Sequence, residues 1–255
     1  MNRRTLLIVL AILVIVGLGY YFYSNPIAPA FSYTVIETGD RQHRENEEFY
    51  TVQINYPDKT PLAERGSGGA ENRAMATITR TAADLVGQFK EVGNVNNLSQ
   101  EEKDRLTQAN QKYSLNVGYK PYSSGNYVSY EFDIFMDTGG AHPNNLFKTL
   151  VFDLNGNTVE LGDLFTNSSY LERISQMAQT QVRDQLIARA GEASVESLIN
   201  EGIAPRAENF ANFVVDSDRL RIFIPPYQAA PYAAGSFEVQ VPLVDVKDIL
   251  KPEVK

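Results

Sequence analysis

A run of 19 uncharged residues near the start of the chain constrains its organisation more than any other feature. It extends from Thr5 to Tyr23, directly follows Arg3 and Arg4, and ends in four consecutive aromatic residues. As a helix it would be about 28 Å long, which is enough to cross the hydrocarbon core of a bilayer. The arginines favour a cytoplasmic N-terminus, and the aromatic residues are typical of the outer membrane–water interface. We therefore expect a single membrane-spanning helix, with the rest of the chain outside the cytoplasm.

A cleaved signal peptide is the alternative to a retained anchor. Ala28, Pro29 and Ala30 resemble a small-residue cleavage site, and cleavage near Ala30 would release a secreted protein. The apolar run is longer than the usual core of a signal peptide, and a proline lies inside the candidate site. We therefore favour residues 1–30 as a membrane anchor and spacer.

Composition excludes several classes of protein. The chain has no cysteine, so it has neither a disulfide framework nor a thiolate nucleophile or metal ligand. Without Arg3 and Arg4, it holds 21 basic and 31 acidic residues, a net charge of −10. Nucleic-acid binding needs a basic surface, so we expect no nucleic-acid partner. An acidic exterior favours cationic partners.

The segments after residue 30 show patterns of strands and helices. Strand-like alternation of apolar and polar residues occurs over residues 31–38, 47–57, 112–122, 126–137, 146–154, 212–224 and 236–243. Helical spacing of apolar residues occurs over 70–92 and 168–190, and continues near 195–199. Ser99 and Glu102 form a capping-box signature that predicts a further helix, and residues 244–250 suggest a short terminal one.

Two tight turns indicate how the strands are connected. Asn155-Gly156 suits a hairpin that leads from residues 146–154 into residues 157–161, and a second hairpin is expected to turn between Asp216 and Asp218. Hairpins and helices without regular strand–helix–strand alternation predict an α+β fold, with antiparallel sheets and packed helices. We expect one α+β domain at residues 31–136 and a second at residues 137–255.

The sequence offers few residues for enzyme catalysis. His43 and His142 are the two histidines, and their separation does not suit a hydrolytic zinc site. No nucleophile elbow, phosphate-binding loop or dinucleotide-binding glycine motif occurs. We expect no metal, no cofactor and no catalytic residues.

Acidic residues allow two further interpretations. Asp133, Asp137, Glu160 and Asp163 lie in strands and turns where a carboxylate pair for glycoside hydrolysis could form, although a solvated acidic face is the simpler interpretation. Asp153, Asn155 and Asn157 alternate like the start of a calcium loop. The glycine comes one position early, however, and Leu164 occupies the twelfth position. A hairpin is the better interpretation of that segment.

Two loops are the candidate binding segments. Residues 137–145 combine Gly139, Gly140, His142 and Pro143 directly after a predicted strand, as either a tight turn or a shaped binding loop. Residues 223–235 read "FIPPYQAAPYAAG" and cannot form a helix or a central strand. In this second loop Pro225 and Pro226 restrict the backbone, so little entropy is lost on binding.

Tyr227 and Tyr232 are the aromatic residues of the second loop. They suit interface anchors, although they could instead plug the core of the domain above the small alanines. We expect Pro225 and Tyr227 to be exposed anchors and Tyr232 to be an internal plug.

These loops also carry a resemblance to a known family. The segments "TGGAHPN", "FDLNGNTVELGDLF" and residues 219–250 resemble the RsiV-like extracytoplasmic domain. That domain occurs in lysozyme-sensing anti-sigma factors of Gram-positive bacteria and beside the deacetylase domain of PdaC. The resemblance covers residues 137–250, and residues 31–136 are similar in pattern to the companion domain that precedes it. It implies an α+β binding domain on a single-pass anchor in a bacterial cell membrane.

The sequence departs from this family in two respects. Only residues 1–4 would lie in the cytoplasm, so we expect no arm that holds a sigma factor, and the two histidines do not supply the metal site of the deacetylase. The extracytoplasmic module is the part of the family that remains.

The resemblance implies binding of a cationic lysozyme-like muramidase, as a receptor, decoy or inhibitor. The alternative is a cell-envelope enzyme or glycan-binding module that acts on peptidoglycan, and it requires a cleft with converging carboxylates. A protruding loop of proline and tyrosine would favour protein capture.

Overall fold

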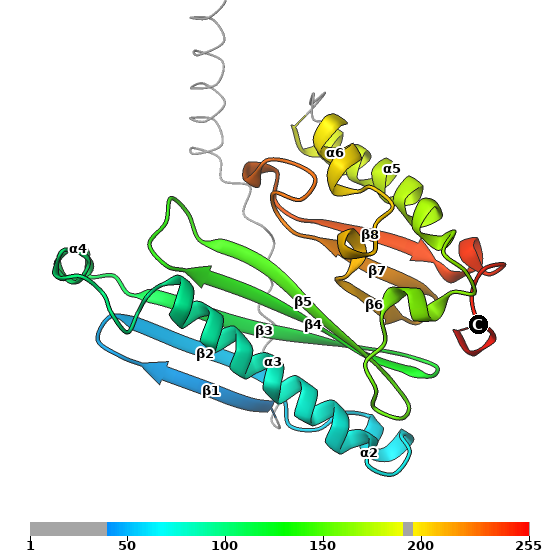
Figure 1. The fold of residues 1–255 in the computed structure, drawn as a ribbon, viewed down its shortest axis with the longest axis horizontal. Coiled ribbons are helices and arrows are strands. Elements are labelled where there is room, and N and C mark those ends of the chain that lie inside the picture. Colours follow the sequence, from blue (N-terminus) through cyan, green and yellow to red (C-terminus); the bar gives the residue numbers. More distant parts are fainter. Residues whose placement is uncertain (1–39, 191–195, 255) are drawn as a thin grey trace, which may run out of the picture.

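A computed structural model of the chain describes residues 40–190 and 196–254 (Figure 1). The expected membrane helix, the spacer up to residue 30 and the expected strand over residues 31–38 lie outside the described residues. Within the described part of the chain, no helix is both long enough and apolar enough to cross a membrane.

The first half of the described chain forms a five-stranded sheet. The strands lie in chain order across it: β1 (Asp40–Asn46), β2 (Tyr50–Pro57), β3 (Tyr113–Ser124), β4 (Tyr127–Asp137) and β5 (Asn144–Asp153). Neighbouring strands are antiparallel, except that β2 and β3 are parallel. Parallel neighbours need a long crossover, which here contains α2 (Leu62–Arg65), α3 (Ala70–Val92) and α4 (Gln100–Ala109). The sheet is therefore mixed, and this one pairing corrects the expectation of purely antiparallel sheets.

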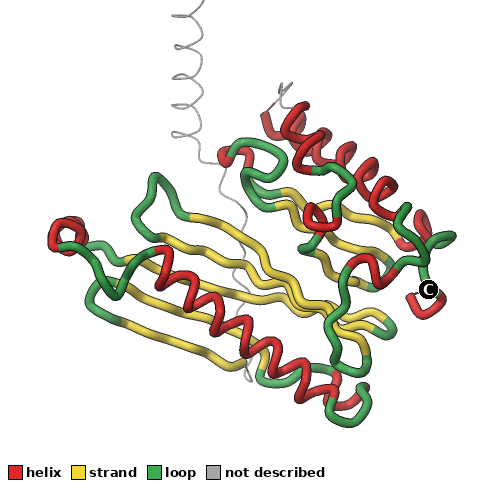
Figure 2. Tube along the Cα trace, in the orientation of Figure 1, coloured by secondary structure: helices red, strands yellow, loops and turns green. Residues whose placement is uncertain are grey.

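Helix α3 covers one face of this sheet (Figures 1 and 2). Its apolar residues recur every three or four positions, so they form one buried stripe that packs on the strands. The stripe consists of Ala74, Ile78, Ala82, Leu85 and Phe89, and it shares a core with Val52, Ile54, Leu115, Val117 and Phe132. The predicted start of α4 is confirmed, since the Ser99 hydroxyl accepts a hydrogen bond from the Glu102 N–H and the Glu102 carboxylate accepts one from the Ser99 N–H.

The second half forms a smaller antiparallel sheet with helices. After β5 the chain passes through a short 3-10 helix (Leu161–Leu164), α5 (Tyr170–Ala190) and α6 (Glu196–Gly202). It then forms β6 (Phe213–Asp216), β7 (Arg219–Ile224) and β8 (Phe237–Pro242). The sheet order is β6-β7-β8. Helix α5 packs its buried residues against the apolar face of this sheet; the shared core includes Ile174, Ala178, Val182, Ile222 and Val239. The α+β expectation is confirmed.

Strand β4 contributes to both halves because its side chains alternate between two faces. Val128, Tyr130 and Phe132 belong to the core beneath α3, whereas Tyr127 belongs to the core of the smaller sheet. Ser129 and its alternate neighbours lie on the same face as Tyr127. Strand β4 therefore takes part in both cores.

The edge strand β6 is held by side chains of the larger sheet. The backbone N–H of Phe213 donates to the Thr149 hydroxyl at 2.9 Å, and the N–H of Val215 donates to the Ser129 hydroxyl at 3.2 Å. Both hydroxyl residues are buried. An unpaired strand edge exposes a row of backbone donors and acceptors, and here two hydroxyls replace the missing strand. We call this contact of β6 with β4 and β5 the sheet seam.

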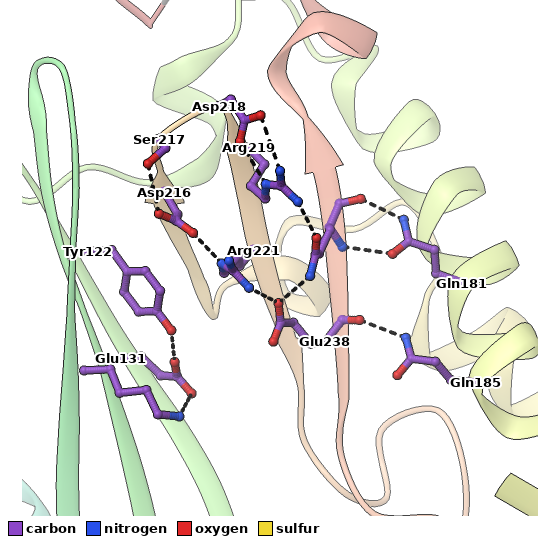
Figure 3. Close-up of polar contacts among 12 residues, drawn as sticks. Tyr122, Glu131, Gln181, Gln185, Asp216, Ser217, Asp218, Arg219, Arg221 and Glu238 are labelled. Carbon is purple, nitrogen blue, oxygen red and sulfur yellow. Dashed lines mark hydrogen bonds and ion pairs between the residues drawn. The ribbon is translucent and has the colours of Figure 1, made fainter. Parts of the chain in front are cut away.

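The opposite edge of the smaller sheet is covered by α5. The Gln181 amide both donates to the Gln240 carbonyl and accepts from the Gln240 N–H, at 2.8 and 2.9 Å. Gln185 donates to the Glu238 carbonyl at 2.8 Å (Figure 3). Helix side chains thus satisfy the free edge of β8.

Several local expectations are corrected. The expected boundary between residues 136 and 137 falls inside the larger sheet, because β5 pairs with β4 along residues 144–153. The turn at Asn155-Gly156 forms, but its second arm pairs only through a bridge between Phe152 and Thr158. Residues 244–250 contain a 3-10 turn (Leu243–Val246) in place of the expected helix.

Candidate functional site

Two loops from distant parts of the sequence meet at one end of the molecule. The β4–β5 loop covers residues 138–143 and the β7–β8 loop covers residues 225–236. They were the two candidate segments of the sequence, and Tyr227 lies 85 residues after His142. Because each loop extends from a different sheet, their contact bridges the two halves of the molecule.

Three aromatic side chains form the contact, which we call the aromatic cluster. His142 stacks on Tyr232 with ring centroids 3.6 Å apart and planes inclined by 15°. Tyr227 lies 5.4 Å from Tyr232 and 5.9 Å from His142, in tilted arrangements. Such offset and tilted pairs each add stabilisation of about 0.5–1.5 kcal/mol. The three rings therefore hold one another in place.

Hydrogen bonds fix the orientation of these rings. His142 Nε2 lies 2.8 Å from the Tyr227 hydroxyl, and His142 Nδ1 lies 3.0 Å from the Pro143 carbonyl. Tyr232 donates to the same carbonyl at 2.6 Å and accepts from the Asn145 amide at 3.0 Å. With Nδ1 donating to Pro143, Nε2 accepts from Tyr227. The polar atoms of the cluster are thus bound internally, and Tyr227 remains exposed.

Tyr227 is both exposed and conformationally strained. The residue is 61% exposed, and its φ is +71°, a left-handed conformation that bulky residues rarely adopt. Strain of this kind costs about 1–3 kcal/mol and persists only where the surroundings impose it. The half-buried Pro225 and Pro226 restrict the backbone before Tyr227.

Hydrogen bonds clamp the β7–β8 loop after Tyr227. After Tyr227, the Gln228 amide donates to the carbonyls of Gly202 and Asn209 at 2.8 and 2.9 Å. Further along, Arg189 donates to the carbonyls of Ala234 and Ser236, each at 2.8 Å. These bonds tie the loop to α5, to α6 and to the segment that follows it. The two prolines before Tyr227 and these bonds after it together impose its conformation.

The structure brings four of the eight predicted binding residues together, and it changes the expected roles of two residues. His142, Pro143, Tyr227 and Tyr232 lie in mutual contact, as just described. The expected exposed position of Tyr227 is confirmed, whereas Pro225, which was also expected to be an exposed anchor, is half-buried. Tyr232 does not plug the apolar core; it is half-buried because it stacks on His142. Ala229 and Ala230 fill the core position instead.

The two predicted glycines lie at the turn of the β4–β5 loop. Gly139 has φ +76°, its N–H donates to the Asp137 carboxylate at 2.9 Å, and an added Cβ would lie 2.7 Å from the Tyr113 ring. Gly140 is exposed, and its conformation does not require glycine. Gly139 therefore shapes the loop, and nothing in the structure explains Gly140.

Sequence reasoning missed the residues that support the cluster. Asn145, Gln228 and Arg189 are polar residues without a motif, and their bonds join segments that are far apart in the sequence. A tyrosine-rich loop signals an interface, but the sequence carries no signal for which amide or guanidinium will hold it.

A second polar cluster lies between the two sheets (Figure 3). On the larger sheet, Tyr122 donates to Glu131 at 2.6 Å, and Lys120 lies 3.5 Å from Glu131 and 3.1 Å from Asp133. On the smaller sheet, Arg221 pairs with Asp216 and with Glu238, at 2.6 Å each. The Arg221 guanidinium lies 5.9 Å from the centre of the Tyr122 ring, which connects the two groups.

Burial governs the titration of the Glu131 carboxyl. Desolvation raises the pKa of Glu131 to about 7, and the neighbouring Asp133 acts in the same direction. The bond from Tyr122 and the charge of Lys120 oppose this shift. Burial and the bond to Glu131 in turn raise the pKa of Tyr122.

The predicted carboxylate candidates do not gather in one place. Asp133 lies beside Glu131, whereas Asp137 binds the turn at Gly139, and Glu160 and Asp163 form the cap of the 3-10 helix that begins at Leu161. Glu131, which completes the one pair, was not predicted. The four candidates for a carboxylate pair therefore do not form one group.

The other residues considered for metal binding, the Asp153 turn and the two histidines, make local contacts. The Asp153 carboxylate accepts from the N–H groups of Asn155 and Asn157, at 2.9 and 2.8 Å, as expected for a turn. His43 lies 3.0 Å from Glu45 on β1, and β1 and β5 are the opposite edges of the larger sheet. Within residues 40–190 and 196–254, no group of three or more histidine, aspartate or glutamate side chains is arranged to hold a metal ion.

Comparison with known sequences identifies a curated relative of the chain. The chain is 26% identical over 256 residues to the peptidoglycan-N-acetylmuramic acid deacetylase PdaC of Bacillus subtilis strain 168. That alignment covers 96% of this chain and 50% of the relative. The chain therefore spans about half the length of that curated relative.

Two solved structures share the fold. A DUF3298-family member from Bacteroides fragilis NCTC 9343 is 21% identical with a TM-score of 0.53, over 87% of this chain and 96% of its own. A DUF3298-family protein from Pseudomonas aeruginosa PAO1 is 15% identical with a TM-score of 0.54, over 84% of this chain and 93% of its own. Residues 162–243 match the family model described as "Protein of unknown function (DUF3298)". This part of the chain, which carries α5, α6, the smaller sheet and the loop with Tyr227, is therefore a DUF3298 domain.

Proposed function

We propose that this chain is a membrane-anchored, extracytoplasmic binding module of the RsiV-like type, which captures a protein partner through the aromatic cluster. The observation that carries the proposal is Tyr227, a large side chain that is exposed although its backbone is strained and clamped. Strain is retained where it serves a site, and rigid exposed tyrosines are typical anchors of interfaces. Pre-ordering lowers the entropy lost on binding.

The proposed partner is a cationic, lysozyme-like muramidase. Without Arg3 and Arg4 the chain carries a net charge of −10, which attracts a basic protein. The relative whose name describes a peptidoglycan deacetylase supports a place in the cell envelope. The 19-residue apolar run from Thr5 to Tyr23 supports retention at the bacterial membrane, with secretion after cleavage near Ala30 as the alternative.

Binding of the purified full chain to immobilised hen lysozyme tests this proposal. Tyr227→Ala should weaken binding by about 30-fold, or about 2 kcal/mol, as loss of an anchor does. The loss of its two ring contacts should lower stability by about 1–3 kcal/mol and leave the chain folded. Val244→Ala is the matched control, because Val244 is also exposed (64%) but lies outside both loops. Cytochrome c, another basic protein, separates specific capture from charge attraction.

Soluble muropeptides form the second arm of this experiment. Binding to muropeptides but not to lysozyme would contradict protein capture and support glycan recognition. Equal binding of the parent and Tyr227→Ala to lysozyme would exclude the aromatic cluster as the site.

A further inference from the structure

The carboxyl group of Glu131 lies within the sheet seam. Ser129 and Glu131 are alternate residues on one face of β4, and Thr149 of β5 is paired directly opposite Glu131. Ser129 and Thr149 are the two residues that accept hydrogen bonds from the backbone of β6. Glu131 itself is only 2% exposed. A titratable group is thus buried in the row of side chains that joins the two sheets.

The groups that face Glu131 only partly compensate an ionised carboxylate. From β3, Tyr122 donates one hydrogen bond at 2.6 Å, and Lys120 lies 3.5 Å away. Lys120 is closer to Asp133, at 3.1 Å, so one ammonium serves two carboxylates. Thr149, opposite on β5, is not titratable. A buried charge that shares its counter-ion is costly.

The charged groups of the smaller sheet are paired among themselves. Arg221 on β7 is engaged by Asp216 on β6 and by Glu238 on β8, and it reaches the Glu131 group only through the Tyr122 ring. Arg221 therefore adds no direct hydrogen bond to the Glu131 carboxylate among those that the structure describes. When Glu131 ionises, only the side chains of β3 compensate its charge.

We propose that Glu131 makes the sheet seam sensitive to pH, so that the seam is closed while Glu131 is protonated and loosens as Glu131 ionises. In the closed seam, burial raises the pKa of this carboxyl to about 7, whereas a hydrated glutamate has a pKa near 4.5. A raised pKa means that the closed state binds its proton more tightly than the open state. Its stabilisation is therefore full below about pH 4.5 and is lost progressively up to about pH 7.

The seam also controls the alignment of the aromatic cluster. His142 belongs to the β4–β5 loop of the larger sheet, while Tyr227 and Tyr232 belong to the β7–β8 loop of the smaller sheet. Loosening the seam lets the two loops separate. The arrangement of Tyr227 thus becomes dependent on pH without titration of any group in the aromatic cluster itself.

Hydrogen exchange on the full chain tests the proposal without any ligand. Protection factors, corrected for the intrinsic pH dependence of exchange, are measured from pH 4.5 to pH 8 in peptides that cover β6 and in peptides that cover α3. Protection of β6 should fall about tenfold or more with rising pH, while α3 stays constant. In Glu131→Gln, which cannot ionise, protection of β6 should be independent of pH.

Two further variants keep the test decisive even if Glu131→Gln does not fold. Tyr122→Phe removes a bond that favours the ionised carboxylate, so the loss of protection should move to higher pH. Asp133→Asn removes a neighbouring negative charge, so the loss should move to lower pH. Opposite shifts support Glu131 as the proton sensor. Two results in β6 would overturn the proposal: constant protection in the parent, or unchanged pH dependence in Glu131→Gln. Shifts of the same sign in the two variants, or a parallel fall in the protection of α3, would also overturn it.

Discussion

Glu45 on the outermost strand β1 shows how a single carboxylate attaches that strand to the rest of the sheet. It accepts hydrogen bonds from Lys90 of α3, from Tyr50 of β2 and from His43, each at 3.0 Å. Burial alone would raise the pKa of Glu45, but these three bonds outweigh it and lower the pKa to about 2. The carboxylate therefore stabilises the folded state only while it is ionised.

The lowered pKa of Glu45 predicts that the folded state loses stability in acid. Because the folded pKa is depressed, the contribution of Glu45 is present above about pH 4.5 and is lost as the pH falls toward 2. Glu45→Gln should cost about 1–2 kcal/mol at pH 7, a figure reduced for solvent screening, and should cost little at pH 2. Denaturant unfolding at both pH values measures this difference. Exposed Glu48→Gln is the control, and an equal loss at pH 2 would contradict the assignment.

Single residues were predictable where their chemistry depends on the local sequence. The prolines and tyrosines of the β7–β8 loop indicated an ordered, exposed segment, and Tyr227 is exposed. The role of Tyr232 was not predictable, because its burial depends on His142, which comes from another loop. Glu131 gave no signal either, since its burial depends on β6 lying against β4.

At the scale of elements, helix α5 acts as a substitute strand for the smaller sheet. Gln181 matches both the donor and the acceptor of the Gln240 backbone, and Gln185 matches the Glu238 carbonyl. A glutamine side chain carries the same pair of groups as a peptide bond, so it can close a strand edge. The helix therefore contributes hydrogen bonds as well as its apolar stripe.

Removing this contact tests its contribution. Gln181→Ala leaves the N–H and C=O of Gln240 without these partners, so it should destabilise the fold by about 1–3 kcal/mol. Gln176→Ala, at an exposed position of the same helix, should change stability by less than about 0.5 kcal/mol. Thermal unfolding of the two variants compares them directly. Similar melting temperatures for both would show that water replaces the glutamine at no cost.

Helices and strands whose apolar residues recur at a regular spacing were predictable, and those without such a spacing were not. Helix α3 and strands β2 to β4 follow apolar periods of three to four and of two residues, and they form as expected. Strand β1 reads "DRQHREN" and has no apolar alternation, because it is an edge strand whose side chains are mostly exposed. The parallel pairing of β2 with β3 depends on where α3 packs, and the spacing of apolar residues alone does not indicate that position.

At the scale of the whole molecule, the two halves depend on each other through β4 and β5. Strand β4 places Tyr127 in the core of the smaller sheet and Ser129 under β6, and β5 supplies Thr149. The backbone donors of β6 would be left without these partners if the larger sheet were absent. The sequence showed two α+β units in succession, but not this shared strand, because residue order does not reveal which face of β4 meets which core.

This arrangement predicts that the second half is not stable by itself. A fragment that begins at Asp137 lacks β1 to β3 and nearly all of β4, so β5 loses its pairing partner and β6 loses the Ser129 hydroxyl. Each buried, unsatisfied backbone group costs about 1–3 kcal/mol, and the exposed face of β5 adds lost apolar burial. We expect the fragment to melt at a markedly lower temperature than one that begins at Asp40, with a broad transition. Calorimetry of the two fragments beside the full chain measures this, and the longer fragment should unfold in a single transition. Two separate transitions in the longer fragment, one of which matches the melting temperature of the shorter, would show that the halves are independent.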